Sequence, residues 1–360
     1  MENTEQQALD LLLRQIREQE GEGFVYDRAE INAELEQSTP LLANLPVKLL
    51  TILGGILASL FLLGFLFATG LYDSPTGMLV AGLLLLAGSV AVIRIRKDTL
   101  AETSCVSFHI IGYLLFGIGF SGLFQSEDAL YSLLALMALG VLFAAANSIL
   151  TFLAVLVFSG SLAAIILNHQ ALNLMHGYIG AVAGLLTYLS LREATLISLG
   201  SWFSRVYGPV RMGLVVTLVA ALALLMHQPP LPAGGITHYW LSGVLLIAAV
   251  LFVLSKVMRQ AGLANRKQQL LVYACCGLVL APTVLSPAVP GALLVLLTSF
   301  YIGHKTSFAA GVLSLVYFVI LYYYDLQLTL LQKSGVLVLT GALFIGGYLL
   351  LQKHLKNDAN

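Results

Sequence analysis

Long apolar stretches follow one another along most of this chain, and they are the feature that most limits its fold. An α-helix needs roughly 20 apolar residues to cross a bilayer. Twelve stretches approach that length: 47–69, 76–95, 104–124, 129–146, 148–167, 173–191, 207–227, 239–258, 269–286, 289–303, 307–324 and 331–351. The sequence therefore predicts an all-α, polytopic integral membrane protein with about twelve transmembrane helices. Composition agrees, because 59% of the residues are hydrophobic and 10% are charged, whereas about 25% are charged in soluble domains.

Two of the divisions between these stretches are weak, and the span count falls to ten if both fail. Only the segment around Asn147 interrupts the apolar run 129–167. The run 269–303 is interrupted only by Ser-Pro-Ala-Val-Pro-Gly at 286–291, where two prolines favour a turn.

The positions of Lys and Arg test these divisions, because cytoplasmic loops of membrane proteins carry an excess of both. With twelve spans and a cytoplasmic N-terminus, 17 of the 18 Lys and Arg residues lie on the cytoplasmic side, and only Lys333 lies outside. If 129–167 were a single span, the arginines between 192 and 211 would move outside. The charges therefore favour the division and predict that both termini are cytoplasmic.

The polar segment before the first stretch differs sharply from the rest of the chain. Residues 1–46 contain ten acidic and three basic residues. We therefore divide the chain into an acidic cytoplasmic helical head at 1–46, a transmembrane helical body at 47–351 and a short cytoplasmic tail at 352–360. Nucleic-acid binding requires clusters of Lys and Arg, so no nucleic-acid partner is expected. The expected partner of the body is the lipid bilayer.

Few side chains in the apolar stretches could carry out chemistry. The three cysteines lie at 105, 275 and 276 without metal-binding spacing, and no catalytic or phosphate-binding motif occurs. We therefore expect no catalytic residue, metal or cofactor, and no enzymatic activity. The best-buried titratable residue is His109, expected to donate to a backbone carbonyl, with a role as relay or ligand as the alternative. Arg211 is expected to extend its charge toward the membrane surface, and His169 and His176 to lack a neighbouring carboxylate.

Two further patterns have both a structural and a functional interpretation. Residues 195–206 place apolar side chains on one helical face, which predicts an interfacial helix; the alternative is a loop anchored by its tryptophan. Glycines recur in two spans, at Gly112, Gly117, Gly119 and Gly122, and at Gly177, Gly180 and Gly184. They are interpreted as close helix packing, or alternatively as discontinuous helices at a substrate site.

A polar cluster stands out near the C-terminus: Tyr322, Tyr323, Tyr324, Asp325 and Lys333. One interpretation is an aromatic belt at the outer interface, with Asp325 as the N-cap of the following helix. The other is a working site that faces an outward-open cavity, in which Asp325 and Lys333 pair across the turn.

The same stretch, Tyr322–Ser334 with the apolar residues 335–351, resembles the C-terminal signature of the bacterial family called domain of unknown function 4401. The resemblance extends over residues 45–351 and has no established reaction attached to it. It implies a multi-pass protein of the bacterial inner (cytoplasmic) membrane, and it suggests a companion membrane protein as a partner.

Two functions remain open at this point. The first is an accessory or scaffold subunit of a membrane complex. The second is a transporter or channel for an uncharged or amphiphilic small solute or lipid. A transporter should contain a polar cavity that reaches the middle of the membrane, and its expected lining comes from Asn147, Tyr178, Thr187, Thr283 and Tyr317.

Overall fold

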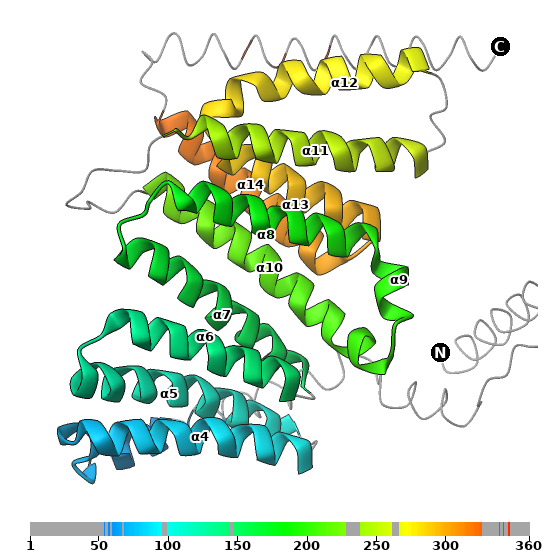
Figure 1. The fold of residues 1–360 in the computed structure, drawn as a ribbon. Helices are drawn as coiled ribbons and strands as arrows, with labels where there is room; N and C mark the ends of the chain where they lie inside the picture. The colour runs from blue at the N-terminus through cyan, green and yellow to red at the C-terminus, as the bar shows by residue number, and fades with distance from the viewer. Residues whose placement is uncertain are drawn as a thin grey trace, which may run out of the picture.

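A computed structural model describes residues 68–95, 99–144, 147–227, 238–260 and 266–325, together with 54, 57, 60–66, 338, 341 and 345. This part consists of α-helices and two short 3₁₀-helices (Figure 1). In chain order they are η2 (Leu71–Asp73), α4 (Pro75–Ile95), α5 (Thr99–Phe124), α6 (Glu127–Ala144), α7 (Ser148–Asn168), α8 (Leu174–Leu191), α9 (Glu193–Ile197), α10 (Ser201–His227), α11 (Trp240–Gln260), α12 (Arg266–Leu280), η3 (Ala281–Leu285), α13 (Ala288–Ile302) and α14 (Lys305–Asp325). The all-α prediction is confirmed for these residues.

Eight of the described helices are long and apolar enough to cross a membrane: α4, α5, α6, α7, α8, α10, α11 and α14. Each coincides with one of the predicted stretches. The predicted stretches 47–69 and 331–351 lie largely outside the described residues.

The weak division at Asn147 is confirmed, because α6 ends at Ala144 and α7 begins at Ser148. The Asn147 side chain is the N-cap of α7 and accepts hydrogen bonds from the backbone nitrogens of Ile149 at 2.7 Å and Leu150 at 3.4 Å. An Asn at this position satisfies helix N–H groups that otherwise have no partner. Its amide also donates to Glu102 of α5 at 3.1 Å, which ties the start of α7 to a third helix.

The division of 269–303 is also confirmed, but neither half is a long α-helix. Helices α12 and α13 have 15 residues each, about 22 Å at 1.5 Å per residue. The five residues of η3 extend α12, and the combined element reaches roughly 32 Å because a 3₁₀-helix rises about 2 Å per residue. Pro287 is the N-cap of α13, so the turn falls where the prolines predicted it.

The interfacial helix predicted over 195–206 is wrong. This segment contains the end of α9 and the beginning of α10, with a break at 198–200 between them. Gly200 has a φ of 153°, a backbone conformation that residues with a side chain rarely adopt. The apolar periodicity therefore spans two elements, and Trp202 stacks on Phe143 of α6 at a ring-centroid distance of 5.6 Å.

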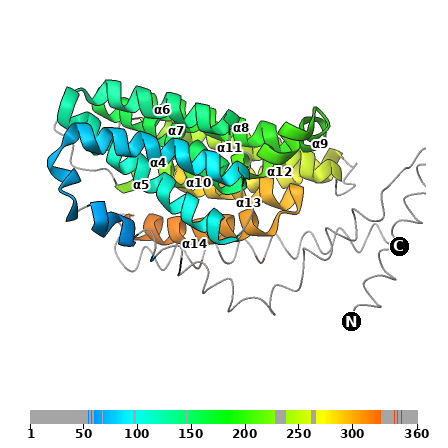
Figure 2. The same cartoon turned by 90° about the horizontal axis from the view of Figure 1, so that it is seen from below.

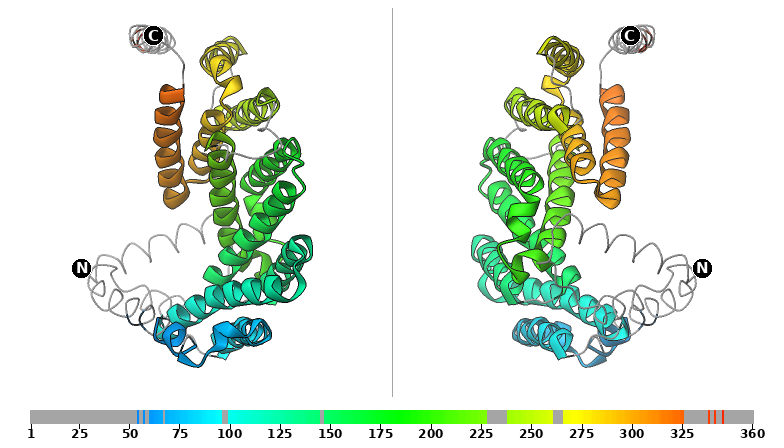
Figure 3. Two further views of the ribbon diagram at one scale, coloured as in Figure 1. Left: turned by 90° about the vertical axis from the view of Figure 1, so that its left-hand side faces the viewer. Right: turned by 90° about the vertical axis from the view of Figure 1, so that its right-hand side faces the viewer.

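The helices lie side by side in a row from α4 and α5 to α12 (Figure 1), and the views from either side, in which most helices are seen nearly end-on, show that the row is bent (Figure 3). Seen from below, α6 and α14 lie at opposite edges (Figure 2). The largest buried core joins α7, α8, α10, α11 and α13, and also includes Leu280 of α12 and Phe318 of α14. Its most deeply buried members include Met175, Leu218, Leu246 and Val295. Helix α13 is thus enclosed mainly by protein, which suits its short length.

Close packing by glycine is confirmed between α4 and α5. A Cβ added to Gly119 would lie 2.5 Å from the backbone nitrogen of Leu79, and one added to Gly82 would lie 2.5 Å from that of Phe116. In lipid no hydrophobic force drives helices together, so the van der Waals contact that such a close approach allows is what stabilises the helix pair. Gly180 packs near Leu245 of α11, whereas a Cβ on Gly184 would meet nothing within 4 Å. The same is true of Gly117 and Gly177, so the packing interpretation does not hold for these three glycines.

Candidate functional site

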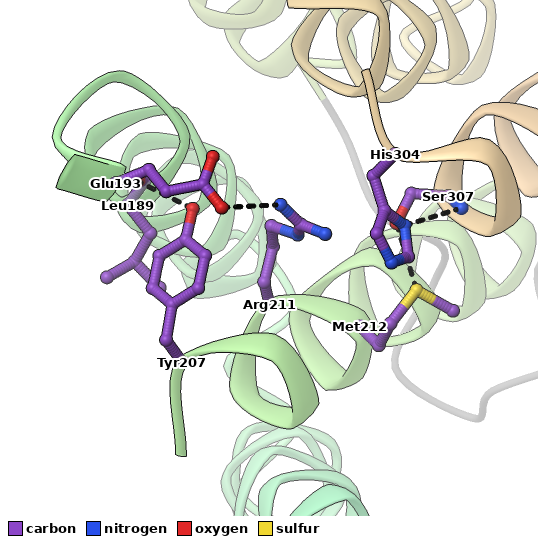
Figure 4. A network of polar contacts seen from close by, with 7 residues as sticks. All are labelled: Leu189, Glu193, Tyr207, Arg211, Met212, His304 and Ser307. Carbon is purple, nitrogen blue, oxygen red and sulfur yellow. Dashed lines mark hydrogen bonds and ion pairs between the residues drawn. The ribbon is translucent and has the colours of Figure 1, made fainter. Parts of the chain in front are cut away.

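The charged end of the bundle carries a buried arginine. Arg211 of α10 is only 4% exposed, and its Nη1 lies 3.7 Å from Oε1 of Glu193 at the start of α9. Its guanidinium carbon lies 5.4 Å from the centre of the Tyr207 ring. Nε and Nη1 have no hydrogen-bond partner. The expected extension of Arg211 to the membrane surface is therefore wrong, and its charge is only partly compensated (Figure 4).

Local structure explains why Arg211 and Glu193 meet. Helix α9 is a five-residue helix that follows α8 directly, so Glu193 is held against the N-terminal half of α10. The Tyr207 hydroxyl donates to the carbonyl oxygen of Leu189 at 3.2 Å and fastens α10 to the end of α8.

His304 approaches this network from the connection between α13 and α14 (Figure 4). Its Nδ1 accepts from the backbone nitrogen of Ser307 at 3.2 Å and lies 3.0 Å from the Ser307 hydroxyl. His304 thus caps the N-terminus of α14, and the Ser307 hydroxyl lies 2.9 Å from the sulfur of Met212 in α10. Partial burial, followed by the positive charge of Arg211, lowers the pKa of His304, while Glu193 opposes the shift.

A cavity of about 670 Å³ opens beside this network. It lies between α8, α11 and α13, which pack against one another. Two cations, Arg192 and Lys256, line it. The other lining residues are threonine, leucine, small residues and aromatic residues: Thr187, Leu191, Gly184, Ala248, Ala249, Tyr188, Phe252 and Tyr301. Its volume is within the range typical of small-molecule sites, about 300–1,000 Å³.

A second cavity of about 300 Å³ lies between α7, α8 and α10 and is almost entirely apolar. Tyr178 and Thr217 are its polar lining residues, and both are engaged elsewhere. The Tyr178 hydroxyl donates to the carbonyl oxygen of Ser159 at 2.9 Å, and the Thr217 and Ser159 hydroxyls lie 3.0 Å apart. This cavity therefore offers few polar groups to a ligand.

The predicted cluster near the C-terminus is described only in part. Tyr322 packs against the main core, whereas Tyr324 is 76% exposed and its ring lies edge-on to that of Tyr323. Asp325 is the last residue of α14. The side chain of Asp325, Lys333 and most of the predicted stretch 331–351 lie outside the described residues, so the N-cap and the Asp325–Lys333 pair remain predictions.

His109 is fully buried, and it meets a side-chain hydroxyl as well as the expected backbone carbonyl, which is that of Leu86. Nδ1 lies 2.7 Å from the Ser89 hydroxyl of α4, and that hydroxyl donates to the carbonyl oxygen of Leu86 at 2.9 Å. Nε2 of His109 has no hydrogen-bond partner. The residue links α4 and α5, and its ring meets that of Tyr113 edge-on at 5.0 Å.

The expectation for the outer histidines is wrong for His169. Its Nε2 lies 3.2 Å from Oδ1 of Asp128, which also accepts from Asn168 at 2.8 Å. His176 is separate and contacts the Ser242 hydroxyl at 3.0 Å. Within the described ranges, no three His, Cys, Asp or Glu side chains are grouped to hold a metal ion.

Comparison with known proteins gives a family assignment. The family described as "Domain of unknown function (DUF4401)" matches residues 44–354, most of the chain. No curated protein and no solved structure matches.

Proposed function

The chain belongs to the DUF4401 family, and from this premise we propose that it is an accessory or scaffold subunit of a membrane complex. The observation that carries the proposal is the use of polar side chains inside the helices. Ser89 and His109 join α4 to α5, Ser159 and Thr217 join α7 to α10, and His176 and Ser242 join α8 to α11. These side chains serve contacts between helices, and Thr217 also lines the 300 Å³ cavity.

The five residues expected to line a transport cavity also support this proposal over a channel. Asn147 caps α7, Thr283 donates to the carbonyl oxygen of Leu280 at 2.7 Å, and Tyr317 lies beside His227. Of the two cavities described above, Thr187 lines the larger and Tyr178 the smaller, so these two residues do not share a cavity.

We propose twelve spans with both termini in the cytoplasm of a bacterial cell and the body in its inner membrane. This count adds α12 with η3, α13 and the two stretches 47–69 and 331–351 to the eight long helices. The Arg and Lys residues support the orientation, because Arg94 is in the last turn of α4, Arg192 follows α8, Arg259 is in the last turn of α11, and Arg266 and Lys305 begin α12 and α14. These helix ends lie on the side of the bundle that carries α9 (Figure 1).

Transport of an uncharged or amphiphilic solute or lipid is the second candidate, and one observation favours it. The 670 Å³ cavity combines cationic and apolar lining, as an amphiphile would require. The primary proposal assigns no reaction to the chain.

Purification in mild detergent through a C-terminal tag tests the primary proposal. We expect a second membrane protein in stoichiometric amount, identified by mass spectrometry, and its loss when residues 1–40 are deleted. Recovery of the intact chain as a single species from native membranes would contradict the proposal. Retention of the partner after the deletion would move the contact from the head to the helical body.

A further inference from the structure

We propose that the 670 Å³ cavity between α8, α11 and α13 binds an acidic phospholipid from the surrounding bilayer, with the headgroup at Arg192 and Lys256 and an acyl chain along Gly184 and Ala248. This site is independent of whether the chain also serves as an accessory subunit. Its support comes from the charge, the hydroxyl and the shape of the cavity.

The two cations are available to an anion. Arg192 follows the last residue of α8, and Lys256 lies four residues before the end of α11. Within the described part of the chain neither forms an ion pair, since the nearby carboxylate of Glu193 is paired with Arg211. Lys256 instead lies 5.5 Å from the centre of the Phe252 ring. Basic pockets between transmembrane helices on the cytoplasmic side recognise lipid headgroups in this way.

A buried hydroxyl lies deeper in the same cavity. Thr187 is 6% exposed, lines the cavity, and its Oγ1 has no hydrogen-bond partner. A helical threonine usually donates to the carbonyl three or four residues earlier, so this unpaired group requires another explanation. It lies one turn from the cationic end, at the depth where the glycerol and ester oxygens of a lipid follow its phosphate.

The remaining lining is suited to a hydrocarbon chain. Gly184 of α8 leaves open space where a Cβ would stand, and Ala248 and Ala249 of α11 face it across the cavity. Tyr188 and Phe252 are about half exposed, so the cavity borders the surface that faces lipid. A small soluble anion would use the cations but not this apolar wall, and we therefore assign the site to a membrane lipid.

Binding can be measured on the full-length tagged chain in mild detergent, with any partner that it retains. The probes are phosphatidylglycerol, phosphatidylcholine and inorganic phosphate, and the readouts are thermal stabilisation and native mass spectrometry. We expect phosphatidylglycerol to stabilise the protein and to remain bound, while phosphatidylcholine and phosphate have little effect. Equal stabilisation by both lipids, or by phosphate alone, would overturn the proposal.

Three variants locate the site. Replacing both cations, Arg192→Gln with Lys256→Gln, should weaken phosphatidylglycerol binding by roughly tenfold or more, because each cation near a membrane surface contributes on the order of 1 kcal/mol. Gly184→Leu should block the cavity without changing charge. Arg259→Gln, on the same helix but outside the cavity lining, is the control and should bind normally.

Unchanged lipid binding in both the double variant and Gly184→Leu would place the lipid elsewhere and refute the site. Unfolding midpoints measured without lipid confirm that each variant is folded. If a variant does not fold, Thr187→Val provides a milder change of the same cavity, with weaker binding expected. Loss of the companion protein would not alter these outcomes, so this site and the accessory role fail separately.

Discussion

Arg211 is a buried cation whose compensation depends mainly on one carboxylate. We expect Glu193→Gln to lower the free energy of unfolding, because the guanidinium would remain buried without a counter-charge. A fully buried pair loses about 3–5 kcal/mol when one partner is removed. Glu193 is 35% exposed, so solvent screening reduces the expected loss to about 1–2 kcal/mol. The midpoint of unfolding in mild detergent measures it.

A second substitution separates charge from shape at this position. Adding Arg211→Met to Glu193→Gln should restore much of the lost stability, because an apolar side chain of similar length leaves no buried charge. Glu127→Gln, in the first turn of α6, is the control and should cost about 0.5 kcal/mol through the helix dipole. If Glu193→Gln matches this control, Glu193 does not compensate the Arg211 charge.

His304 should make the stability of the bundle depend on pH. Its folded-state pKa lies below the ordinary value, so at pH values just below about 6.5 the unfolded chain binds a proton that the folded chain does not. Stability is therefore retained above that pH and falls as the pH decreases through this window. The pKa is lowered by partial burial of the imidazole and then by the positive charge of Arg211. Protonation would also prevent Nδ1 from accepting from Ser307 and would place a positive charge at the start of α14.

The variant His304→Asn isolates this effect. Asparagine is a good N-cap and does not titrate in this range, so the variant should keep the cap at every pH. We expect the wild-type protein to lose about 1 kcal/mol relative to the variant between pH 7.5 and pH 5.5, on the scale of one lost cap. Parallel pH curves for the two proteins would show that protonation occurs without breaking the cap.

At the level of elements, the contact between α4 and α5 depends on glycine at defined positions. We expect Gly119→Ala to destabilise the protein by about 1–3 kcal/mol, because its Cβ would overlap the backbone of α4 at Leu79. Gly117→Ala is a matched control on the same helix, since a Cβ there meets nothing within 4 Å. Thermal unfolding of the two variants in detergent compares them directly. Equal midpoints would mean that α4 and α5 do not pack at this distance.

The helices could be predicted from the sequence much better than the site. Apolar length located the eight long helices, and the charge pattern with Asn147 predicted the break between α6 and α7. The position of Glu193 beside Arg211 could not be predicted from the sequence, because it depends on how α9 packs against α10. The cavity could not be predicted either, because its lining comes from three helices that are far apart in the sequence. In the sequence alone, its small residues look like those of ordinary helix packing.

Some signals at the residue level were present but too weak to interpret. A threonine such as Thr187 is common in membrane helices, and only its missing hydrogen bond distinguishes it. The role of His304 could have been suspected from its position directly before Lys305 and three residues before Ser307, which suits an N-cap. The partner of His109 required knowledge that α4 packs on α5.

For the whole molecule, the distribution of charge gives a prediction of sidedness. Arg94, Arg259, Arg266 and Lys305 belong to the helix ends on the side of α9. Asp73 precedes α4, Glu127 and Asp128 begin α6, and Asp325 ends α14, which are the opposite ends of these helices. A reporter fused after Pro232 should therefore lie outside the cytoplasm, and one fused after Gly262 should lie inside. A cytoplasmic signal from the Pro232 fusion would contradict the twelve-span arrangement.

The short connection between α6 and α7 has a consequence for biogenesis. Only three residues separate the two helices. This connection is too short to form a soluble loop that is translocated as a separate step between the insertion of the two helices. We expect the two helices to enter the membrane together, as a helical hairpin. If they entered as one long span instead, every later helix would take the opposite orientation. We therefore expect the insertion of the C-terminal half of the protein to depend on this turn, where Asn147 caps α7.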